Sequence, residues 1–524
     1  MIHIVSTGRL AAAATRTEAA LAVHAPHLVD AFTRHLPAAA DTVGRRLRAA
    51  LVREDLTPRT AGGHLHAFHR VEYPHAGVAD PVDLLAGIDP TGTMSAEIRN
   101  AVINLAIALA RFDPAVPDGA NPDLRAVHLE RLAVAGHNLH PCGRTRLGWD
   151  TADVLAHDLE AGHTPLKFIA VRDDAHLGDD LGAVLEGVPA APPGYRTQPL
   201  HGWQHDTVLH RYADLFTDGT LRRLDGHLDA VPTSALRTLL LPGGQYLKVS
   251  LDIQVTSTRR SISVASTRNG PALSRLLHRL VDDDRILLMA ETAGAAVPAG
   301  SGRDLSAIVR TGLTGRLQPG ELAIPGGALP AYDPVTGRTV LAGLVDQSGG
   351  TAETWLTDYT RLLLPPLLRL LADGVALEAH LQNCLPTFRG GHPHRLALRD
   401  FAGLRLHPGR LADAGHTIDL WPGSVVGTGD TEILRAKLGY TALQAHLGEL
   451  VIRLAESHHL DETRAWRVIR EVVDDTYDTL STHRHAAADH SWLIAAQVPH
   501  KALVRMRLAG TGDIHIPVSN PLHG

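Results

Sequence analysis

Basic and hydroxyl side chains are concentrated in one short stretch, residues 248–263, KVSLDIQVTSTRRSIS. Apolar and polar residues alternate there, which is typical of a strand with one buried face, and the polar face carries Lys248 and ends in Thr-Ser-Thr-Arg-Arg. We expect a helix to start near Ser261, and helix N-termini present free N–H donors to anions. The stretch therefore predicts an anion-binding corner, and the alternative is an exposed basic edge strand.

A second group of basic residues lies in the loop of residues 136–149, GHNLHPCGRTRLGW. The glycines and the proline fix a tight turn. The imidazoles of His137 and His140 and the guanidiniums of Arg144 and Arg146 are able to converge on a phosphate group. The alternative for this loop is a basic segment on the surface.

Carboxylates and carboxamides gather in a third stretch, residues 376–401. Glu378, His380 and Gln382 alternate, Asn383 follows, and Asp400 ends the second strand of a hairpin predicted around a glycine turn. One or two carboxylates together with nucleotide phosphates are usually enough to bind Mg²⁺. The stretch predicts a site for magnesium and an acid substrate, and the alternative is a buried polar network that joins a helix to the hairpin.

These three stretches need elements that hold them in place. A Pro-Gly-Gly turn leads from residues 233–238 into the central strand, so two strands with polar side chains are expected to lie side by side. A long helix at 351–379 is expected to kink or break at Pro365-Pro366. The other expected elements are helices over 1–60, 94–112, 122–135 and 262–282, strands over 165–173 and 285–292, mainly helix over 428–505, and an unstructured tail NPLHG.

Composition narrows the class of protein. A chain of 524 residues is too long for one core and predicts two or three subdomains. The net charge of −6 gives no electrostatic case for nucleic-acid binding. Cys142 and Cys384 lack the spacing of a disulfide framework or a metal site, which fits a reducing cytoplasm. We find neither a signal-peptide pattern nor an apolar run long enough to span a membrane, so no membrane partner is expected.

Six motifs in order resemble one family, the NRPS-independent siderophore synthetases, also called the aerobactin-synthetase or IucA/IucC family. They cover about residues 136–521, which is about three quarters of the chain. The motifs are GHNLHPCGRTRLGW, HGWQ, SALRT, KVSLDIQVTSTRRSIS with the NGP that follows, EAHLQN with LRDF, and KALVRMRL with a later NP.

The resemblance implies an α+β fold likened to a hand, with mixed antiparallel sheets and a helical C-terminal region. It implies a mainly helical, thumb-like domain at 1–150, a fingers-like domain with the nucleotide site at 151–350 and a palm-like domain with a hairpin at 351–524. It further implies a ligase that uses ATP and Mg²⁺ to adenylate a carboxylate of citrate or a related acid. An amine, hydroxylamine or alcohol then displaces AMP to give an amide or ester. Homodimers are common in the family.

The resemblance also implies roles for individual residues. Lys248, Arg260 and a metal ion would screen the repulsion between the attacking carboxylate and the α-phosphate, and His380 would orient the acid or act as a base. These three residues carry the implied catalytic roles. The implied ATP contacts are His137, His140, Arg144, Ser234, Arg237, Thr238, Lys248 and Arg260; the acid contacts are Thr256, Arg260, His380 and Gln382; the metal ligands are Glu378, Asn383 and Asp400.

Some positions depart from the family pattern. Arg144 stands where lysine is usual, Trp149 where phenylalanine is usual and Asp252 where asparagine is common. The sequence leaves open which acid and which nucleophile react, with citrate, 2-oxoglutarate and succinyl-type acids all in use in the family. Two other functions remain as alternatives: an idle relative that binds a nucleotide or carboxylate, and an ATP-dependent phosphotransferase. The lack of a GxxxxGK[ST] loop and of an HRD-type loop argues against the common kinases.

Overall fold

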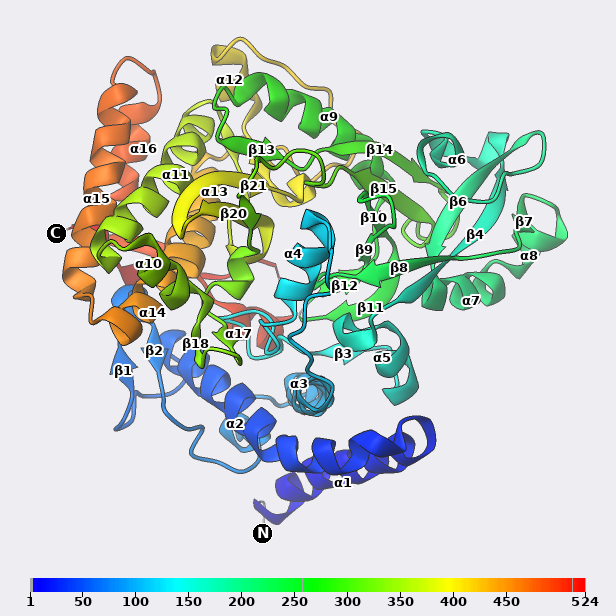
Figure 1. The fold of residues 1–524 in the computed structure, drawn as a ribbon, viewed down its shortest axis with the longest axis horizontal. Coiled ribbons are helices and arrows are strands. Elements are labelled where there is room, and N and C mark those ends of the chain that lie inside the picture. The colour runs from blue at the N-terminus through cyan, green and yellow to red at the C-terminus, as the bar shows by residue number, and fades with distance from the viewer. Residues whose placement is uncertain (1–2, 257, 511, 524) are drawn as a thin grey trace.

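The computed structural model of the chain describes residues 3–256, 258–510 and 512–523, so Ser257 of the basic stretch lies outside the described residues. Helices and sheets are mixed, as the sequence predicted, with N-terminal helices below, a large sheet on one side and C-terminal helices on the other (Figure 1). None of the described helices combines the length and the apolar character that a membrane crossing requires.

The N-terminal helices pack on one another and form one wall of the molecule. They are α1 (His3–His24), α2 (Val29–Arg53) and α3 (Thr93–Ala110), which confirms helices in both predicted regions. The apolar residues of α2 recur at helical spacing and are buried against α3. Helix α4 (Pro122–Glu130) ends before the expected residue 135 because the chain turns from Arg131 to Gly136. A hairpin of β1 (His64–Leu65) and β2 (Val71–Glu72) lies between α2 and α3 in the sequence.

Nine of the described strands form one antiparallel sheet in the order β5-β14-β15-β10-β9-β8-β4-β6, with β7 also paired to β4. The Pro-Gly-Gly turn joins β9 to β10, and Thr238 lies opposite Lys248, so the two polar strands are side by side as predicted. The strands are β4 (Thr164–Arg172), β5 (Leu177–Gly178), β6 (Tyr195–His201), β7 (Leu221–Arg223), β8 (Leu228–Pro232), β9 (Thr238–Leu240), β10 (Tyr246–Val249), β14 (Glu291–Ala296) and β15 (Ser306–Arg310).

The stretch predicted as one central strand is two strands in two sheets. β10 ends at Val249, and β11 (Leu251–Val255) belongs to a small sheet with β3 (Arg146–Leu147) and β12 (Thr258–Arg260). The change occurs at Ser250, whose buried hydroxyl donates to the Arg303 carbonyl and accepts from the Ile262 N–H. Because the chain first returns along β12, helix α9 (Val264–Leu280) starts slightly later than expected, with Ser263 as its N-cap.

The C-terminal half surrounds a four-stranded sheet of β13 (Ile286–Leu288), β21 (His392–Leu398), β20 (Cys384–Arg389) and β16 (Leu322–Ala323). The β20–β21 hairpin is confirmed. The predicted strand at 285–292 is wrong in that it divides between β13 here and β14 in the large sheet.

Helix α11 (Ala352–Ala372) runs unbroken through Pro365-Pro366, so the expected break is wrong. Buried aromatic and leucine side chains on both sides of the prolines hold it against the core. The tail is also ordered, since β24 (His515–Ser519) pairs with β23 (Gln497–Lys501) and a short 3-10 helix (Pro521–His523) follows.

The remaining elements cover the sheets and close the cavity described below. They are α5 (Thr151–His157), α6 (Leu181–Val184), α7 (Gly202–Arg211), α8 (Ala213–Thr217), β17 (Tyr332–Asp333), β18 (Arg338–Thr339), α10 (Val340–Ser348), β19 (Val375–Ala376), β22 (Arg405–Leu406), α12 (Pro408–Asp413), α13 (Thr431–Leu438), a π-helix (Gly439–Leu447), α14 (Gly448–His458), α15 (Glu462–Thr479), α16 (Ala486–Leu493) and α17 (Leu503–Ala509).

Candidate active site

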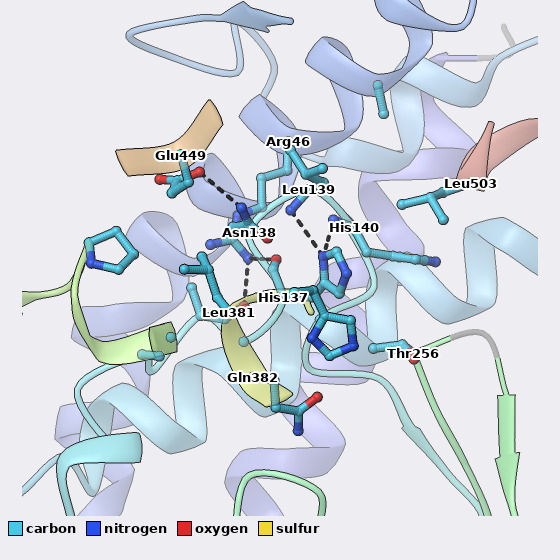
Figure 2. Close-up of a pocket in the computed structure, with 18 of the residues that line it drawn as sticks. Arg46, His137, Asn138, Leu139, His140, Thr256, Leu381, Gln382, Glu449 and Leu503 are labelled. Carbon is cyan, nitrogen blue, oxygen red and sulfur yellow. Dashed lines mark hydrogen bonds between the residues drawn. The ribbon is translucent and has the colours of Figure 1, made fainter. Parts of the chain in front are cut away.

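A single large cavity of ≈ 1760 Å³ lies where the N-terminal helices, the histidine loop, β12 and the C-terminal helices meet (Figure 2). Pockets for one small molecule commonly measure about 300–1,000 Å³, so this cavity has room for more than one substrate. Nine of the predicted site residues line it: His137, His140, Arg144, Ser234, Thr256, Arg260, Glu378, His380 and Gln382. The other predicted residues, Arg237, Thr238, Lys248, Asn383 and Asp400, lie behind its wall.

The histidine loop presents two neutral imidazoles. Nδ1 of His137 accepts hydrogen bonds from the backbone N–H groups of Leu139 (3.1 Å) and His140 (3.2 Å), and Nδ1 of His140 accepts one from Cys142 (3.0 Å). Because Nδ1 accepts in both rings, the proton of each neutral ring lies on Nε2. Burial lowers the pKa of His140 to about 3 and that of His137 well below 6.5. Nε2 of His140 is buried without a partner, so it can donate to a bound anion.

Burial of His140 predicts that the protein loses stability in mild acid. Its folded pKa of about 3 lies below the ordinary 6.5, so between these values the unfolded chain binds a proton that the folded protein excludes. Stability from this group is therefore complete above pH 6.5 and falls by about 1.4 kcal/mol per pH unit below it, or about 2 kcal/mol at pH 5. Urea unfolding at pH 7 and 5 measures the difference. His140→Asn should reduce this pH dependence by about 2 kcal/mol, whereas the exposed His392→Asn should not. Equal dependence in all three proteins would contradict the assignment.

Arg144 is held by carboxylates rather than left free. Its guanidinium pairs with Glu160 (Nη2–Oε1 2.5 Å) and with Asp158 (Nη1–Oδ1 3.4 Å), and its Nε donates to the Val134 carbonyl. Arg146 also pairs with Asp158 (Nε–Oδ2 3.0 Å). The network fixes the histidine loop to the segment after α5. Arg144 lines the cavity with its charge already neutralised, and its contact with ATP stays a prediction.

Arg260 opens on the cavity without a carboxylate partner in the described part of the chain. Its Nη2 donates to Oγ1 of Thr256 (3.2 Å), and its Nε is buried and unpartnered. Burial, followed by the field of Arg237, lowers its pKa to about 10, so it stays charged at neutral pH. The side chain of its neighbour Arg259 is 68% exposed and pairs with Asp252. Of these two adjacent arginines, Arg260 therefore lies at the site, and Arg259 lies on the surface.

Behind the wall, Lys248 belongs to a buried ionic cluster. Its Nζ lies 2.5 Å from Oδ1 of Asp400 and 3.8 Å from Oε1 of Glu291, and Arg310 lies 4.0 Å and 3.9 Å from the same two carboxylates. Nη1 of Arg237 donates to the carbonyls of Arg260 (3.0 Å) and Ser261 (3.1 Å). Arg237 therefore supports the backbone next to Arg260. Thr238 is buried on β9 beside Lys248.

The expected helix corner is not part of this cavity. Ser263 uses its hydroxyl to cap α9 by accepting from the Ser266 N–H (3.2 Å). None of the described residues of α9 lines the cavity. The anion-binding corner predicted at the start of this helix is therefore wrong in place, and the cavity takes Thr256 and Arg260 from the β11–β12 hairpin instead.

Across the cavity, Gln382 and Ser234 are brought together, since Gln382 Nε2 donates to Ser234 Oγ (3.2 Å). Two residues missed from the sequence hold them. Glu130 accepts from the Ser234 N–H (2.7 Å) and pairs with Arg399 (2.5 Å), whose Nε donates to the Gln382 carbonyl (3.0 Å). Arg399 belongs to the LRDF motif, so the sequence contained a signal for it. Glu130, at the end of α4, belongs to no motif.

Of the three predicted metal ligands, the two carboxylates are ionised and paired with lysines. Glu378 pairs with Lys437 (2.5 Å), and Asn383 Nδ2 donates to the Glu378 carbonyl (3.0 Å). Burial alone would raise the pKa of both carboxyls, but Lys437 lowers that of Glu378, and Lys248 and Arg310 hold that of Asp400 well below its ordinary value. Ionised carboxylate oxygens are the ligands that Mg²⁺ prefers. The donor types fit Mg²⁺, but both carboxylates are paired with lysines in the structure, and of the three residues Glu378 alone lines the cavity.

A further group of metal-type ligands lies on the cavity wall. His64, His66 and Glu462 offer ligand atoms within 4.8 Å of one another, and among the described residues this is the group of three such side chains that could hold an ion. His66 Nδ1 lies 2.7 Å from Oε1 of Glu462, which ties the β1–β2 hairpin to α15. The His-x-His spacing of His64 and His66, at the end of β1, was the signal in the sequence.

Comparisons with known proteins agree with this architecture. Residues 125–331 match the family model of the IucA / IucC family, and residues 353–514 match that of the ferric iron reductase FhuF-like transporter. A D-ornithine–citrate ligase of Staphylococcus aureus is 26% identical over 460 residues, which cover 75% of this chain and 70% of the relative.

Solved structures show the same fold. The petrobactin biosynthesis protein AsbB of Bacillus anthracis matches with a TM-score of 0.83 and 19% identity, over 95% of this chain and 97% of that one. The ATP-bound aerobactin synthetase IucA of Klebsiella pneumoniae matches with a TM-score of 0.73 and 20% identity, over 92% and 99%. Over residues 125–331 the chain therefore resembles the IucA / IucC family, and it is similar to relatives that are named as ligases and siderophore synthetases.

Proposed function

We propose that the protein uses ATP and Mg²⁺ to adenylate a carboxylate of citrate or a related acid, and then joins the acyl group to an amine, hydroxylamine or alcohol. AMP and pyrophosphate are the other products. The observation that carries this proposal is Arg260, a partly buried cation without a carboxylate partner among the described residues, which opens on the same cavity as His137 and His140. A relative that is named as a ligase of citrate with D-ornithine supports the choice of acid.

Arg260 and the histidine loop supply what the first step needs. An acid carboxylate that attacks the α-phosphate must approach another anion, and a fixed guanidinium lowers this repulsion in the transition state. Its forked donors bind phosphate or carboxylate oxygens in pairs. The Nε2–H groups of His137 and His140 add neutral donors, which hold phosphate oxygens without a change in protonation.

His380, Gln382 and Thr256 are proposed to hold the acid. Burial lowers the pKa of His380, although Glu378 and Asp400 act in the opposite direction, so the imidazole is neutral at pH 7. A neutral imidazole donates one hydrogen bond and accepts one. We assign it to orienting the acid, because adenylation already activates the carboxyl carbon.

Glu378, Asn383 and Asp400 are proposed to hold Mg²⁺, which supplies positive charge at the triphosphate when it is bound. Lys437 and Lys248 neutralise the two carboxylates in the structure. When the nucleotide binds, we expect both ammonium groups to move to its phosphate oxygens. Each carboxylate is then free to bind Mg²⁺.

The test is incubation of the protein with ATP, Mg²⁺, hydroxylamine and one acid at a time. The acids are citrate, 2-oxoglutarate, succinate and hydroxamate-bearing succinyl-diamines. We expect hydroxamate, AMP and pyrophosphate to appear together, and only with acid. ADP in place of AMP would identify a phosphotransferase. Binding of ATP without any acid-dependent product would identify an idle relative.

A further inference from the structure

Two buried polar atoms at one end of the cavity have no hydrogen-bond partner among the described residues. Arg53 closes α2, Tyr440 is the second residue of the π-helix, and both line the cavity. Nε of Arg53 and the hydroxyl of Tyr440 are buried without a hydrogen-bond partner. In the described part of the chain no carboxylate pairs with Arg53. The Arg53 side chain as a whole is only partly buried, but its Nε is shielded from water without a partner, which suits an anion bound in the cavity.

The carboxylates near Arg53 are engaged elsewhere. Glu54, the next residue, accepts from the backbone N–H groups of Val504 (3.0 Å) and Arg505 (2.7 Å). Glu72 lies 2.6 Å from Arg70 and 2.5 Å from Arg453. Burial and the field of Arg70 lower the pKa of Arg53 to about 10, so it is charged at neutral pH. The guanidinium is therefore left for a molecule in the cavity.

Tyr440 supplies a matching donor. Burial raises the pKa of its hydroxyl, so the O–H is intact at neutral pH. Arg53 and Tyr440 lie close enough that each shifts the pKa of the other. A forked guanidinium with an adjacent O–H matches the oxygens of one carboxylate. Tyr440 lies in a π-helix, a rare element that is often found at functional sites.

This end of the cavity is separate from the acid end. Leu139 packs with Tyr440 and Leu503, whereas His137 and His140 of the same loop face the other way. Figure 2 shows Leu139 and Leu503 on one side of the two histidine rings and Thr256 and Gln382 on the other. Tyr440 therefore lies on the Leu139 side of the loop, and Thr256, which Arg260 contacts, lies on the other side. The end of the cavity that contains Tyr440 and Arg53 has room for a second substrate.

We infer that Arg53 and Tyr440 bind the carboxylate of the amine substrate, so that the nucleophile is an amino acid with a second amino group. The inference rests on the proposed function, and it specifies the nucleophile class. The free amino group attacks the carbonyl carbon of the acyl adenylate, a C–N bond forms, the C–O bond to AMP breaks, AMP leaves with the bonding pair, and the nitrogen loses a proton. The carboxylate stays on the guanidinium.

Pairs of diamines that differ only in the carboxylate test this inference. They are ornithine and 1,4-diaminobutane, lysine and 1,5-diaminopentane, and 2,3-diaminopropionate and 1,2-diaminoethane. A hydrogen bond to a charged group predicts that the carboxylate-bearing member of the matching pair has a kcat/KM about 10- to 100-fold higher. Arg53→Met and Tyr440→Phe should remove most of this preference. Arg34→Met, an exposed arginine of the same helix, should keep it.

Two further measurements distinguish failure of this inference from failure of the proposed function. Calorimetric titration with the same pairs does not depend on catalysis, and we expect tighter binding of one carboxylate-bearing member that is lost in Arg53→Met. Acid-dependent exchange of pyrophosphate into ATP, without amine, tests the proposed function, and Arg53→Met should leave it unchanged. A raised KM for the acid in that variant would assign the carboxylate to the acid and overturn the inference. Equal binding and equal or absent product from both members of every pair would also overturn it.

Discussion

Replacement of Arg260 by alanine is expected to reduce acid-dependent pyrophosphate release by at least about 100-fold, while the protein stays folded. Loss of one preorganised donor to developing charge commonly costs about 10²–10³ in rate. Arg260 opens on the cavity beside Thr256 and has no carboxylate partner among the described residues, so its loss removes a charge that would screen the attacking carboxylate. Initial rates of pyrophosphate release, with and without acid, measure the effect.

Arg259 provides a matched control. It is the adjacent residue of the same strand, its side chain is mostly exposed, and it pairs with Asp252 on the surface. Arg259→Ala should keep a rate within about twofold of the native protein, on the general rule that exposed ion pairs contribute little. Arg260→Lys should restore charge but not the forked geometry, and therefore only part of the rate. Normal turnover by folded Arg260→Ala would remove Arg260 from the mechanism.

Replacement of Asp400 by asparagine is expected to lower the free energy of unfolding by about 3 kcal/mol, the lower end of the usual cost of breaking a buried ion pair, because Lys248 is buried but the Asp400 side chain is 28% exposed. The change keeps the shape of the side chain, so it creates no cavity. It leaves Lys248, which is 3% exposed in its side chain, with only the more distant Glu291. Urea unfolding measures the difference.

The half-exposed pair of Lys501 and Asp513 is the control for this substitution. Its atoms lie 2.7 Å apart, which is close to the 2.5 Å of Lys248 and Asp400. Solvent screens it, so Asp513→Asn should cost less than about 1 kcal/mol. A loss of that size for Asp400→Asn as well would show that burial adds nothing to the interaction of Lys248 with Asp400.

Local patterns in the sequence predicted the long helices and several of the main strands, because apolar spacing follows the helix and strand periods directly. They failed where a single residue changed the path of the chain. Alternation placed Lys248 and Thr256 on one polar face, but the turn at Ser250 sends the two into different sheets. Lys248 therefore lies behind the wall and Thr256 in the cavity. The Ser250 hydroxyl bonds to a distant loop at the point where one continuous strand would bond to its neighbour. A side-chain contact of this kind leaves no periodic pattern in the sequence.

Site residues from recognisable motifs were found, and residues that the fold alone brings together were missed. Glu130 pairs with Arg399 from a different part of the chain, and Arg53 and Tyr440, also far apart in the sequence, line the same cavity. Neither pair has a spacing that a single sequence can reveal. The division into three domains and the role of each site residue stay predictions, because they depend on substrates and motions that a fold does not record.

The contact of Glu54 with Val504 and Arg505 has a consequence for biosynthesis. The two sides of this contact are 450 residues apart, and the Glu54 carboxylate is buried by it. A ribosome adds about 5–20 residues per second, so this carboxylate waits about 20–90 s for its donors. During that time the N-terminal helices expose the surface that later accepts α17. The cavity is therefore complete only after α17 has been synthesised. A chain that stops before α17 would leave the ribosome with an incomplete cavity.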